Sequence, residues 1–257
     1  MSEVILEIMR DHIHRLADHG KRIDGRGFDE VRPISIEKSF IGTAEGSARI
    51  KLGNTDVVVG VKVDIGEPFP DRPKDGVLLT GAELKPMASP EFEPGPPKPS
   101  SIELARVVDR GIRESKMFAL EKLCIVPGEK VWMVFVDIHV IDYDGNLFDA
   151  SSMAALAALT TTTVNASKFD EGEDFPLPIE HYPVSCTIAK IGNVLMVDPS
   201  LEEEQVADAR LTIAMDEASN LRAMQKGLKG AFTYDELMEC LKKSHAVSKD
   251  IRAKILK

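Results

Sequence analysis

The sequence predicts an α+β protein built from two related halves. Segments rich in valine and isoleucine, with the two-residue alternation of strands, come in groups that are followed by helix-like segments, and this order occurs twice in the 257 residues;. A polar connection at residues 168–174 separates the groups and places the division near residues 166–180. A chain of this length can bury one large core or two smaller ones.

The first half is predicted to contain a hairpin and a central strand. Residues 47–52 (SARIKL) and 55–65 (TDVVVGVKVDI) alternate as strands do, and the Gly53-Asn54 pair between them favours a tight turn;. Residues 131–142 (VWMVFVDIHVID) form a longer and mostly apolar segment, which is typical of a strand with neighbours on both sides;.

Two helices are expected before this central strand. The first ends at Gly20, since glycine tolerates the backbone conformation that closes a helix;. Its apolar residues at helical spacing are Val4, Ile5, Ile8 and Leu16. The second follows a loop with six prolines in residues 86–100, begins at a cap, Ser100 or Ser101, and continues to about Leu123;. Its apolar face consists of Ala105, Val108, Ile112 and Ala119.

A third helix, two hairpins and a last helix complete the pattern. Residues 150–159 are mostly small and follow Asp149, a plausible helix cap, so this helix is expected to lie deep in the molecule;. The hairpins are expected at residues 184–198 and 210–225;. The last helix opens at residues 233–236 (TYDE), which have the pattern of a capping box;.

Composition and charge limit the possible functions. The formal net charge is -10, so broad attraction to nucleic acid is not expected and any nucleic-acid site must be local;. The three cysteines lack CxxC spacing, which predicts reduced thiols and no disulfide framework or zinc site; they are Cys124, Cys186 and Cys240;. Because the N-terminal segment carries charges throughout, we expect neither a signal peptide nor a membrane span, and a cytoplasmic location.

Several short motifs occur in order along nearly the whole chain. They are RIDGR at 22–26, GSARIKLGNT at 46–55, ELARVVDRGIRES at 103–115 and DYDGNLFDASSMAALAAL at 142–159. These motifs resemble the RNase PH family, which comprises phosphorolytic 3′-to-5′ exoribonucleases and the ring subunits of the exosome. The resemblance implies the RNase PH fold, with two βαβα-like halves of the ribosomal protein S5 domain 2-like kind. The implied segments are an N-terminal helix with the RxDGR motif (1–27), domain 1 (28–166) and domain 2 (180–252).

Within this family the chain most resembles the archaeal exosome ring subunit that lacks catalytic residues. That resemblance implies a six-membered ring of three heterodimers, in which this subunit alternates with a catalytic RNase PH-like partner. RNA-binding cap subunits and single-stranded RNA are the further partners that it implies. No cofactor and no resident metal are expected.

The loop before the third helix departs from the pattern of active relatives. Phosphorolysis requires hydrogen-bond donors that hold an attacking phosphate, and active relatives place a Gly-Thr-Arg-like loop after an Asp-Gly pair. Here that pair is followed by Asn146, Leu147 and Phe148, of which the last two have no side-chain donor. Asp149 then adds negative charge, so we expect a plain turn capped by Asp149, with weak anion binding through backbone amides as the alternative.

The expected metal site is altered as well. Active relatives carry two aspartates six residues apart, and alignment of their motif places Glu204 and Arg210 at these positions. Glu204 could still hold a metal, whereas the guanidinium of Arg210 would repel it. A displaced carboxylate, Asp208, would be needed to restore the pair. We expect instead that Arg210 pairs with Glu204 or Asp208, and that Glu202 and Glu203 form a solvated edge.

Arginines on the second helix are the candidate RNA contacts. Arg106, Arg110 and Arg113 lie at i, i+4 and i+7, which places them on one stripe away from the apolar face;. Guanidinium groups suit phosphate oxygens, and the resemblance places this helix beside the RNA path and the partner's active site. Pairing with neighbouring acids such as Asp109 is the alternative. Arg72, on a loop rich in proline and aspartate, could reach into a channel or lie on a plain surface loop.

Together these features predict a non-catalytic ring subunit that binds RNA and structures the active site of a catalytic partner. An independently active, phosphate-dependent 3′-to-5′ exoribonuclease is the alternative. A scaffold without RNA contact is the third hypothesis.

Overall fold

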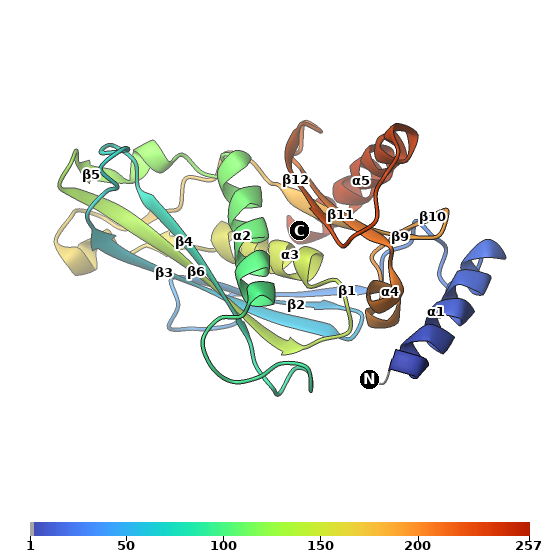
Figure 1. Cartoon of the computed structure of the whole chain (residues 1–257). Helices are drawn as coiled ribbons and strands as arrows, with labels where there is room; N and C mark the ends of the chain where they lie inside the picture. The colour runs from blue at the N-terminus through green and yellow to red at the C-terminus, as the bar shows by residue number, and fades with distance from the viewer. Residues whose placement is uncertain (1–2) are drawn as a thin grey trace.

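In the computed structural model, which describes residues 3–257, the N-terminal half of the chain forms a six-stranded β-sheet (Figure 1). Its strands are β1 (Ile34–Lys38), β2 (Gly46–Leu52), β3 (Thr55–Gly66), β4 (Val77–Leu84), β5 (Cys124–Val126) and β6 (Lys130–Asp142). Their order is β1-β2-β3-β6-β4, with β5 paired to β6, and β4 runs parallel to β6 while the other pairs are antiparallel. The predicted β2–β3 hairpin and the central position of β6 are confirmed.

The second sheet is antiparallel throughout. Its strands are β9 (Val184–Ile191), β10 (Val194–Val197), β11 (Ala209–Met215) and β12 (Leu221–Gly227). They are arranged in the order β10-β9-β11-β12, so both hairpins expected in this half are confirmed. A two-stranded ribbon of β7 (Thr163–Val164) and β8 (Phe175–Pro176) lies in the connection between the sheets. The segment boundaries given above (1–27, 28–166 and 180–252) stay a prediction.

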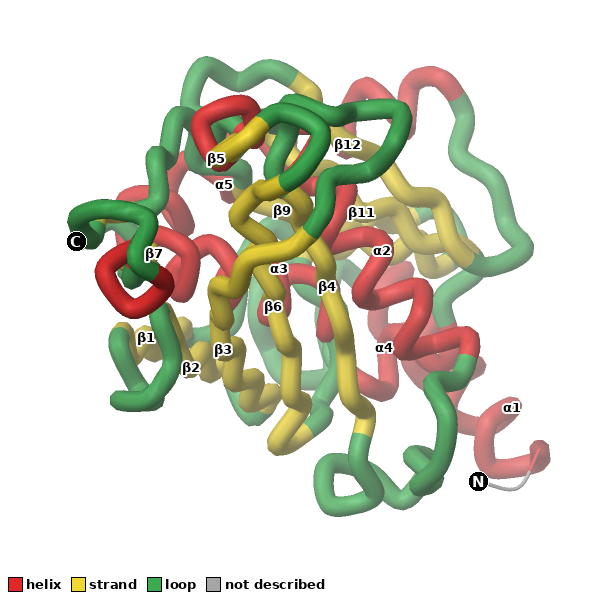
Figure 2. The backbone as a smooth tube through the Cα atoms, turned by 90° about the vertical axis from the view of Figure 1, so that its left-hand side faces the viewer, coloured by secondary structure: helices red, strands yellow, loops and turns green. Residues whose placement is uncertain are grey.

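A nearly fully buried helix joins the two sheets. The helices are α1 (Glu3–Asp18), α2 (Pro99–Glu114), α3 (Leu147–Thr160), α4 (Leu201–Val206) and α5 (Tyr234–Ile255), with 3-10 turns at η1 (Leu120–Leu123) and η2 (Ala166–Phe169). As predicted, α3 lies deep inside, in contact with β2 and β3 on one side and β9 on the other. In Figure 2, β3, β6 and β4 stand in front of it. None of the described helices is both long and apolar enough to cross a membrane.

The close contact between α3 and the first sheet depends on small residues. Alanines dominate the buried surface of the helix, so that its backbone can approach the strands;. At Gly46 of β2 a Cβ atom would lie 2.1 Å from Thr162 Oγ1 and 2.6 Å from the carbonyl oxygen of Ala158. Only glycine fits at this strand position.

Helix α2 is shorter than the sequence predicted. Lys98 is the N-cap and Pro99 the first helical residue, while Ser101 Oγ donates to the Lys98 carbonyl and does not cap the helix. The helix ends at Glu114 and not near Leu123, because Lys116 adopts the left-handed conformation (φ 53°) and the Met117 amide donates back to the Ile112 carbonyl;. Ala119 therefore lies outside the helix. Neither glycine nor proline marks the end of α2, so a prediction based on apolar periodicity placed the end of the helix too late.

Helix α1 packs on the second sheet through a different face from the one predicted. Ile13 and Ala17 are buried in a small cluster with Ile191, Met196 and Val206, whereas Ile8 is 64% exposed. Leu16 is half-buried, and the side chains of Val4 and Ile5 lie outside those that the structure describes. Gly20 (φ 72°) follows the end of the helix as predicted.

Of the two helix starts with a capping box in the second half, one was predicted and the other was not. The capping box at Thr233 and Glu236 of α5 is confirmed. The acidic run before β11, expected to be a solvated edge, forms α4, with a second capping box between Ser200 and Glu203. The prediction was wrong for Glu203, which is fully buried, and Glu202 is half-buried.

Glu203 is buried because it pairs with the first arginine of the RxDGR motif. Arg22 Nε lies 2.9 Å from Glu203 Oε1 and Arg22 Nη2 lies 2.5 Å from Glu203 Oε2, with no side-chain exposure on either residue. Arg22 also donates to the carbonyl oxygens of Val197 and Asp198. This ion pair holds the N-terminal segment against the second half.

Removal of one partner of this pair should destabilise the fold strongly. Arg22→Met leaves the Glu203 carboxylate buried without its cation, so we expect a loss of about 3–5 kcal/mol in the free energy of unfolding, measured by urea denaturation. The double variant with Glu203→Met should lose less than the single variant, because both charges are gone. Arg10→Met, at the more exposed Arg10–Asp208 pair, is the control and should cost about 1 kcal/mol or less;. Losses that simply add in the double variant would contradict this account.

Candidate functional site

The site is organised around the buried carboxylate of Asp198, at the end of β10. Asp198 is 1% exposed and accepts hydrogen bonds from the backbone amide, Nε and Nη2 of Arg32 at 2.8–2.9 Å. Arg26 Nη1, from the RxDGR motif, donates at 3.0 Å, and Asn146 Nδ2 donates at 2.7 Å. Burial alone would raise the pKa of Asp198, but the bonds and charge of Arg32 and the bond from Asn146 hold it below its usual range;.

Asn146, and not Asp149, caps helix α3. Asn146 takes up the left-handed conformation (φ 54°), and its Oδ1 accepts from the Asp149 amide. Its Nδ2 donates both to Asp198 and to Asp149 Oδ2, the latter at 2.8 Å. The prediction that Asp149 is the cap was therefore wrong. The fully buried Asn146 amide is used inside the protein and points at two carboxylates.

Asp149 faces the second sheet. Its carboxylate accepts from the amide and the hydroxyl of Thr187, both at 2.8 Å. Burial raises the pKa of Asp149 to about 7, although the hydrogen bonds from Asn146 and Thr187 oppose the shift;. Asp149 therefore joins α3 to β9 and does not project into a ligand site.

Phe148 and Arg210 contact each other directly. The Arg210 guanidinium carbon lies 4.2 Å from the centroid of the Phe148 ring, and Arg210 Nη2 lies 3.1 Å from Glu103 Oε1 of α2. Gly227 of β12 leaves room for this side chain, because a Cβ there would be 2.8 Å from Arg210 Nη2. Cation–π stacking and an ion pair thus hold Arg210 in place. The expected pairing of Arg210 with Glu204 or Asp208 was wrong.

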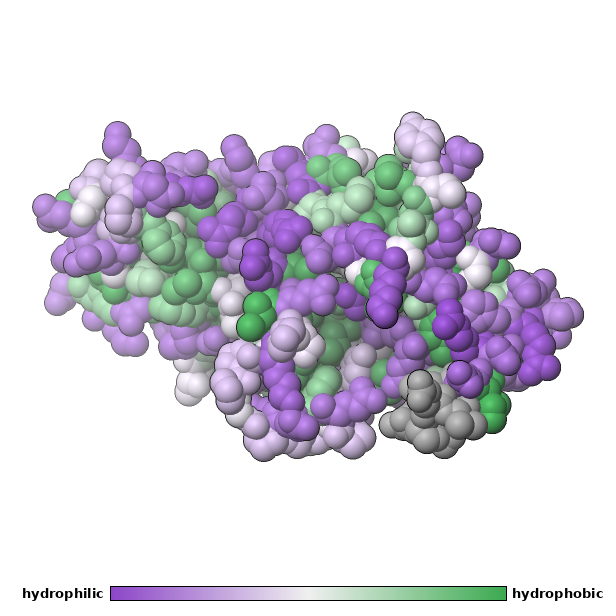
Figure 3. Space-filling view, in the orientation of Figure 1, coloured by the Kyte–Doolittle hydropathy of each residue, from purple (hydrophilic) through white to green (hydrophobic). Residues whose placement is uncertain are grey.

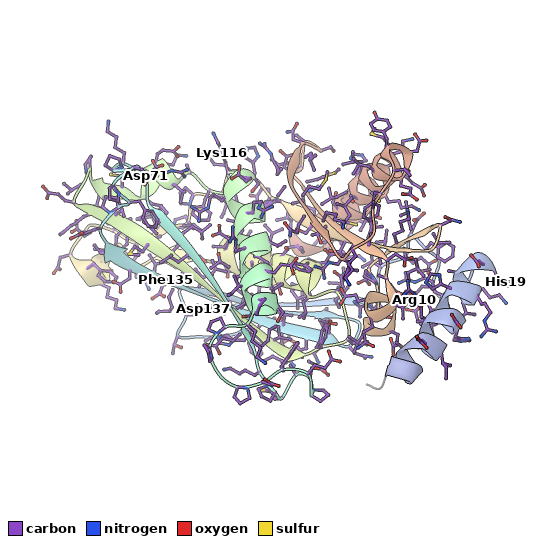
Figure 4. All side chains as sticks on the ribbon, viewed as in Figure 1. Arg10, His19, Asp71, Lys116, Phe135 and Asp137 are labelled. Atoms are coloured by element: carbon purple, nitrogen blue, oxygen red, sulfur yellow. The ribbon has the colours of Figure 1, made fainter. Side chains whose placement is uncertain are left out.

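Glu204 and Asp208 have separate partners. Glu204 Oε2 accepts from the Tyr143 hydroxyl at 3.0 Å, and burial raises the pKa of Glu204 although the charge of Arg210 lowers it. Asp208 pairs with Arg10 of α1 at 2.6 Å and accepts from the Gly192 amide at 2.8 Å, and Figure 4 shows Arg10 on α1. The second carboxylate is therefore not restored by displacement to Asp208.

The rest of the described structure also lacks a group of residues that could bind a metal ion. Within residues 3–257, no group of three or more histidine, cysteine or acidic side chains is arranged to hold a metal ion. The described cysteines are free thiols, as predicted: Cys124, Cys186 and Cys240.

The arginines of α2 lie along one groove. Arg106 is exposed and forms no ion pair with the residues that the structure describes, while Arg110 Nη1 donates to Gln225 Oε1 at 3.2 Å. Arg113 pairs with Asp109 at 3.0 Å and also donates to the Leu78 carbonyl of β4. All three line a cavity of about 320 Å³ between α2 and β4. In Figure 3, hydrophilic surface runs along α2 beside apolar surface over β4.

The loop arginine lies next to this groove. Arg72 lines a second cavity of about 400 Å³, which shares Leu78 and Arg113 with the first. Arg72 is 54% exposed, and its nearest carboxylate is that of Asp71 at 3.9 Å. The structure therefore brings together all four arginines that the sequence singled out.

Sequence reasoning missed the residues that connect the groove to Arg210. Gln225 Nε2 lies 3.4 Å from Glu103 Oε1, so that Arg110, Gln225, Glu103 and Arg210 form one chain of contacts. Glu103 lies seven residues before Arg110, two helical turns away on the same face, and this spacing could have been read from the sequence. The position of Gln225 could not, because it depends on how the second sheet packs on α2.

Two family models match this chain. Domain 1 of the 3′ exoribonuclease (RNase PH) family matches residues 30–165, and domain 2 matches residues 181–247. The protein belongs to the RNase PH family. The RNase PH fold that the motifs implied is confirmed, because RNase PH family members with solved structures share it over almost the whole chain.

Family members from archaea are closely similar. The exosome complex component Rrp42 of Pyrococcus horikoshii is 52% identical over 99% of this chain and 96% of its own length. The Rrp42 of Thermoplasma acidophilum is 53% identical over 98% of this chain and 97% of its own.

Solved structures of RNase PH family members superpose well. A chain of the Archaeoglobus fulgidus exosome with RNA bound to the active site has a TM-score of 0.95 and 52% identity, covering 98% of this chain and 99% of that one. A chain of an archaeal exosome core has a TM-score of 0.91 and 48% identity, covering 99% and 98% of the two chains.

The buried carboxyl of Asp149 should make stability depend on pH. Its pKa is raised from 3.8 to about 7, so the native state holds this proton more tightly than the unfolded state;. Its contribution to stability is therefore complete below about pH 4 and is lost as pH rises to about 7. We expect Asp149→Asn, which cannot ionise, to gain stability relative to the wild type across this interval, as measured by urea unfolding at several pH values. Parallel curves for the two proteins would contradict the shift.

Proposed function

We propose that this protein is a non-catalytic subunit of an archaeal-type exosome ring. It binds RNA and shapes the active site of a catalytic, RNase PH-like partner, with which it alternates in a ring of three heterodimers that also carries RNA-binding cap subunits. Membership of the RNase PH family and the similarity to exosome components over nearly the whole chain support this assignment.

One contact carries the non-catalytic part of the proposal: the stacking of Arg210 on Phe148 at 4.2 Å. Phe148, the second residue of α3, lies where active relatives are expected to hold phosphate, and Arg210 lies where they are expected to carry the second metal-binding carboxylate. Here Arg210 and Phe148 stack on each other, and Asn146 donates its side-chain hydrogen bonds to Asp149 and Asp198. Neither a phosphate nor a divalent cation has a favourable set of ligands at this place.

The RNA-binding part rests on the groove along α2. Arg106 is exposed and unpaired within the described part of the chain, and Arg110 keeps most of its donors beyond its bond to Gln225;. Arg113, already paired with Asp109, and Arg72 at the neighbouring cavity extend the same basic edge. In a chain of net charge -10, these side chains concentrate positive potential where a phosphate backbone could lie;.

Restoring one carboxylate should not restore catalysis. Arg210→Asp removes the repelling cation, but the loop at Asn146, Leu147 and Phe148 still offers no phosphate donor, so we expect no release of nucleoside diphosphates from RNA. The assay uses the purified chain with inorganic phosphate and magnesium, with the wild type measured in parallel. Release by the variant would overturn this proposal. Release by the wild type that Glu204→Gln abolishes would favour the alternative, an independently active exoribonuclease.

Charge reversal on α2 should weaken RNA binding by the assembled ring. For Arg106→Glu with Arg110→Glu we expect affinity for single-stranded RNA to fall by about tenfold or more at moderate salt. The slope of log affinity against log salt should become shallower by about 1.4, since each phosphate contact to single-stranded RNA contributes about 0.7. Reversal of two exposed cations elsewhere, Arg15→Glu with Lys254→Glu, is the control. Unchanged affinity in the α2 variant would support a scaffold without RNA contact.

A further inference from the structure

A second cavity continues the groove beyond the arginine stripe. It has a volume of about 400 Å³, within the range of small-ligand sites, and it meets the first cavity at Leu78 and Arg113;. Apolar side chains form its inner wall: Leu78, Ile112, Phe118 and Leu120. Basic side chains lie around them, and among these is Lys116, a residue that the sequence did not point to.

Lys116 holds an unusual backbone position. It follows the C-terminus of α2 in the left-handed conformation (φ 53°), where glycine is the preferred residue and any side chain is disfavoured;. The ammonium group is exposed and has no carboxylate within ion-pair distance among the residues described here. Favourable interaction with the helix C-terminus offsets part of this cost. Figure 4 shows Lys116 at the end of α2, on the same side of the molecule as Asp71 in the loop that carries Arg72.

Basic side chains outnumber acidic ones in the lining of the cavity. Four basic side chains line it, namely Arg72, Arg113, Lys116 and Lys122, against the three acids Asp75, Glu121 and Glu180. Lys122 and Glu180 pair with each other at 2.9 Å, and Arg113 is held by Asp109. Lys116 and Arg72 remain as the cations with the fewest partners. A phosphodiester carries one negative charge, whereas a free nucleoside diphosphate carries more.

We propose that this cavity binds one nucleotide of single-stranded RNA. The base lies against Leu78, Phe118 and Leu120, and the phosphodiester lies at Lys116 and Arg72. Apolar contact with a base is tolerant of sequence, which suits a degradative path. The proposal rests on the proposed RNA-binding role of the α2 arginines and extends their path by one subsite.

Binding of the dinucleotide ApA to the full chain tests this subsite. ApA has two bases and a single phosphodiester, and calorimetric titration of the wild type should show saturable binding. Lys116→Gly should weaken ApA binding by about fivefold or more, because the positive charge is removed. The same variant should be more stable than the wild type, because the backbone strain at residue 116 is removed. Lys116→Arg retains the charge and should bind nearly as the wild type does. Ser219→Gly, at another left-handed residue (φ 67°), is the control for relief of strain and should leave ApA affinity unchanged.

Three results would overturn the proposal. They are no saturable binding of ApA, equal affinity in Lys116→Gly, or inorganic phosphate binding as tightly as ApA, which would indicate an anion site without a base. Such a failure is distinct from failure of the proposed function, because the RNA affinity of the assembled ring is measured separately through Arg106 and Arg110. A ring that binds RNA through those arginines while the chain does not bind ApA would lack only this subsite.

Discussion

The burial of the Asp198 carboxylate is the constraint on which the arrangement of the molecule depends. A charged group at 1% exposure is stable only if hydrogen bonds and opposite charge replace its hydration;. Arg26 and Arg32 supply these from the N-terminal segment, and Asn146 supplies a further donor from the start of α3. One side chain of the second half thereby fixes the N-terminal segment and the cap of the helix that lies between the sheets.

The positions at which the sequence departs from the pattern expected of active relatives are in contact with one another. Arg210 stacks on Phe148 and pairs with Glu103, and Gly227 leaves the space that the guanidinium needs. Through Glu103 and Gln225 this cluster continues to Arg110 of the basic groove. The residues proposed to stand in place of a phosphate loop and a metal ligand are thus part of the support for the surface proposed to bind RNA.

Local patterns predicted most of the fold and much of the candidate site. Two-residue alternation located the hairpins, a long and mostly apolar segment indicated the central β6, and helical spacing grouped Arg106, Arg110 and Arg113 correctly. Several of the failures concern partners that only the tertiary structure brings together. Glu203 was expected in solvent because its partner, Arg22, lies 181 residues away in the sequence. Residues 114–116 contain no sequence signal for the end of α2, because a lysine occupies the position where glycine is usual.

The two hydrogen bonds that the Asn146 side-chain amide donates restrict which residues can occupy position 146. Both hydrogens of its amide serve buried carboxylates, those of Asp149 and Asp198. Any substitution at residue 146 leaves two buried carboxyl groups without these donors, so a single change there should cost stability;. Selection for a stable fold therefore constrains residue 146 independently of any ligand that this loop binds.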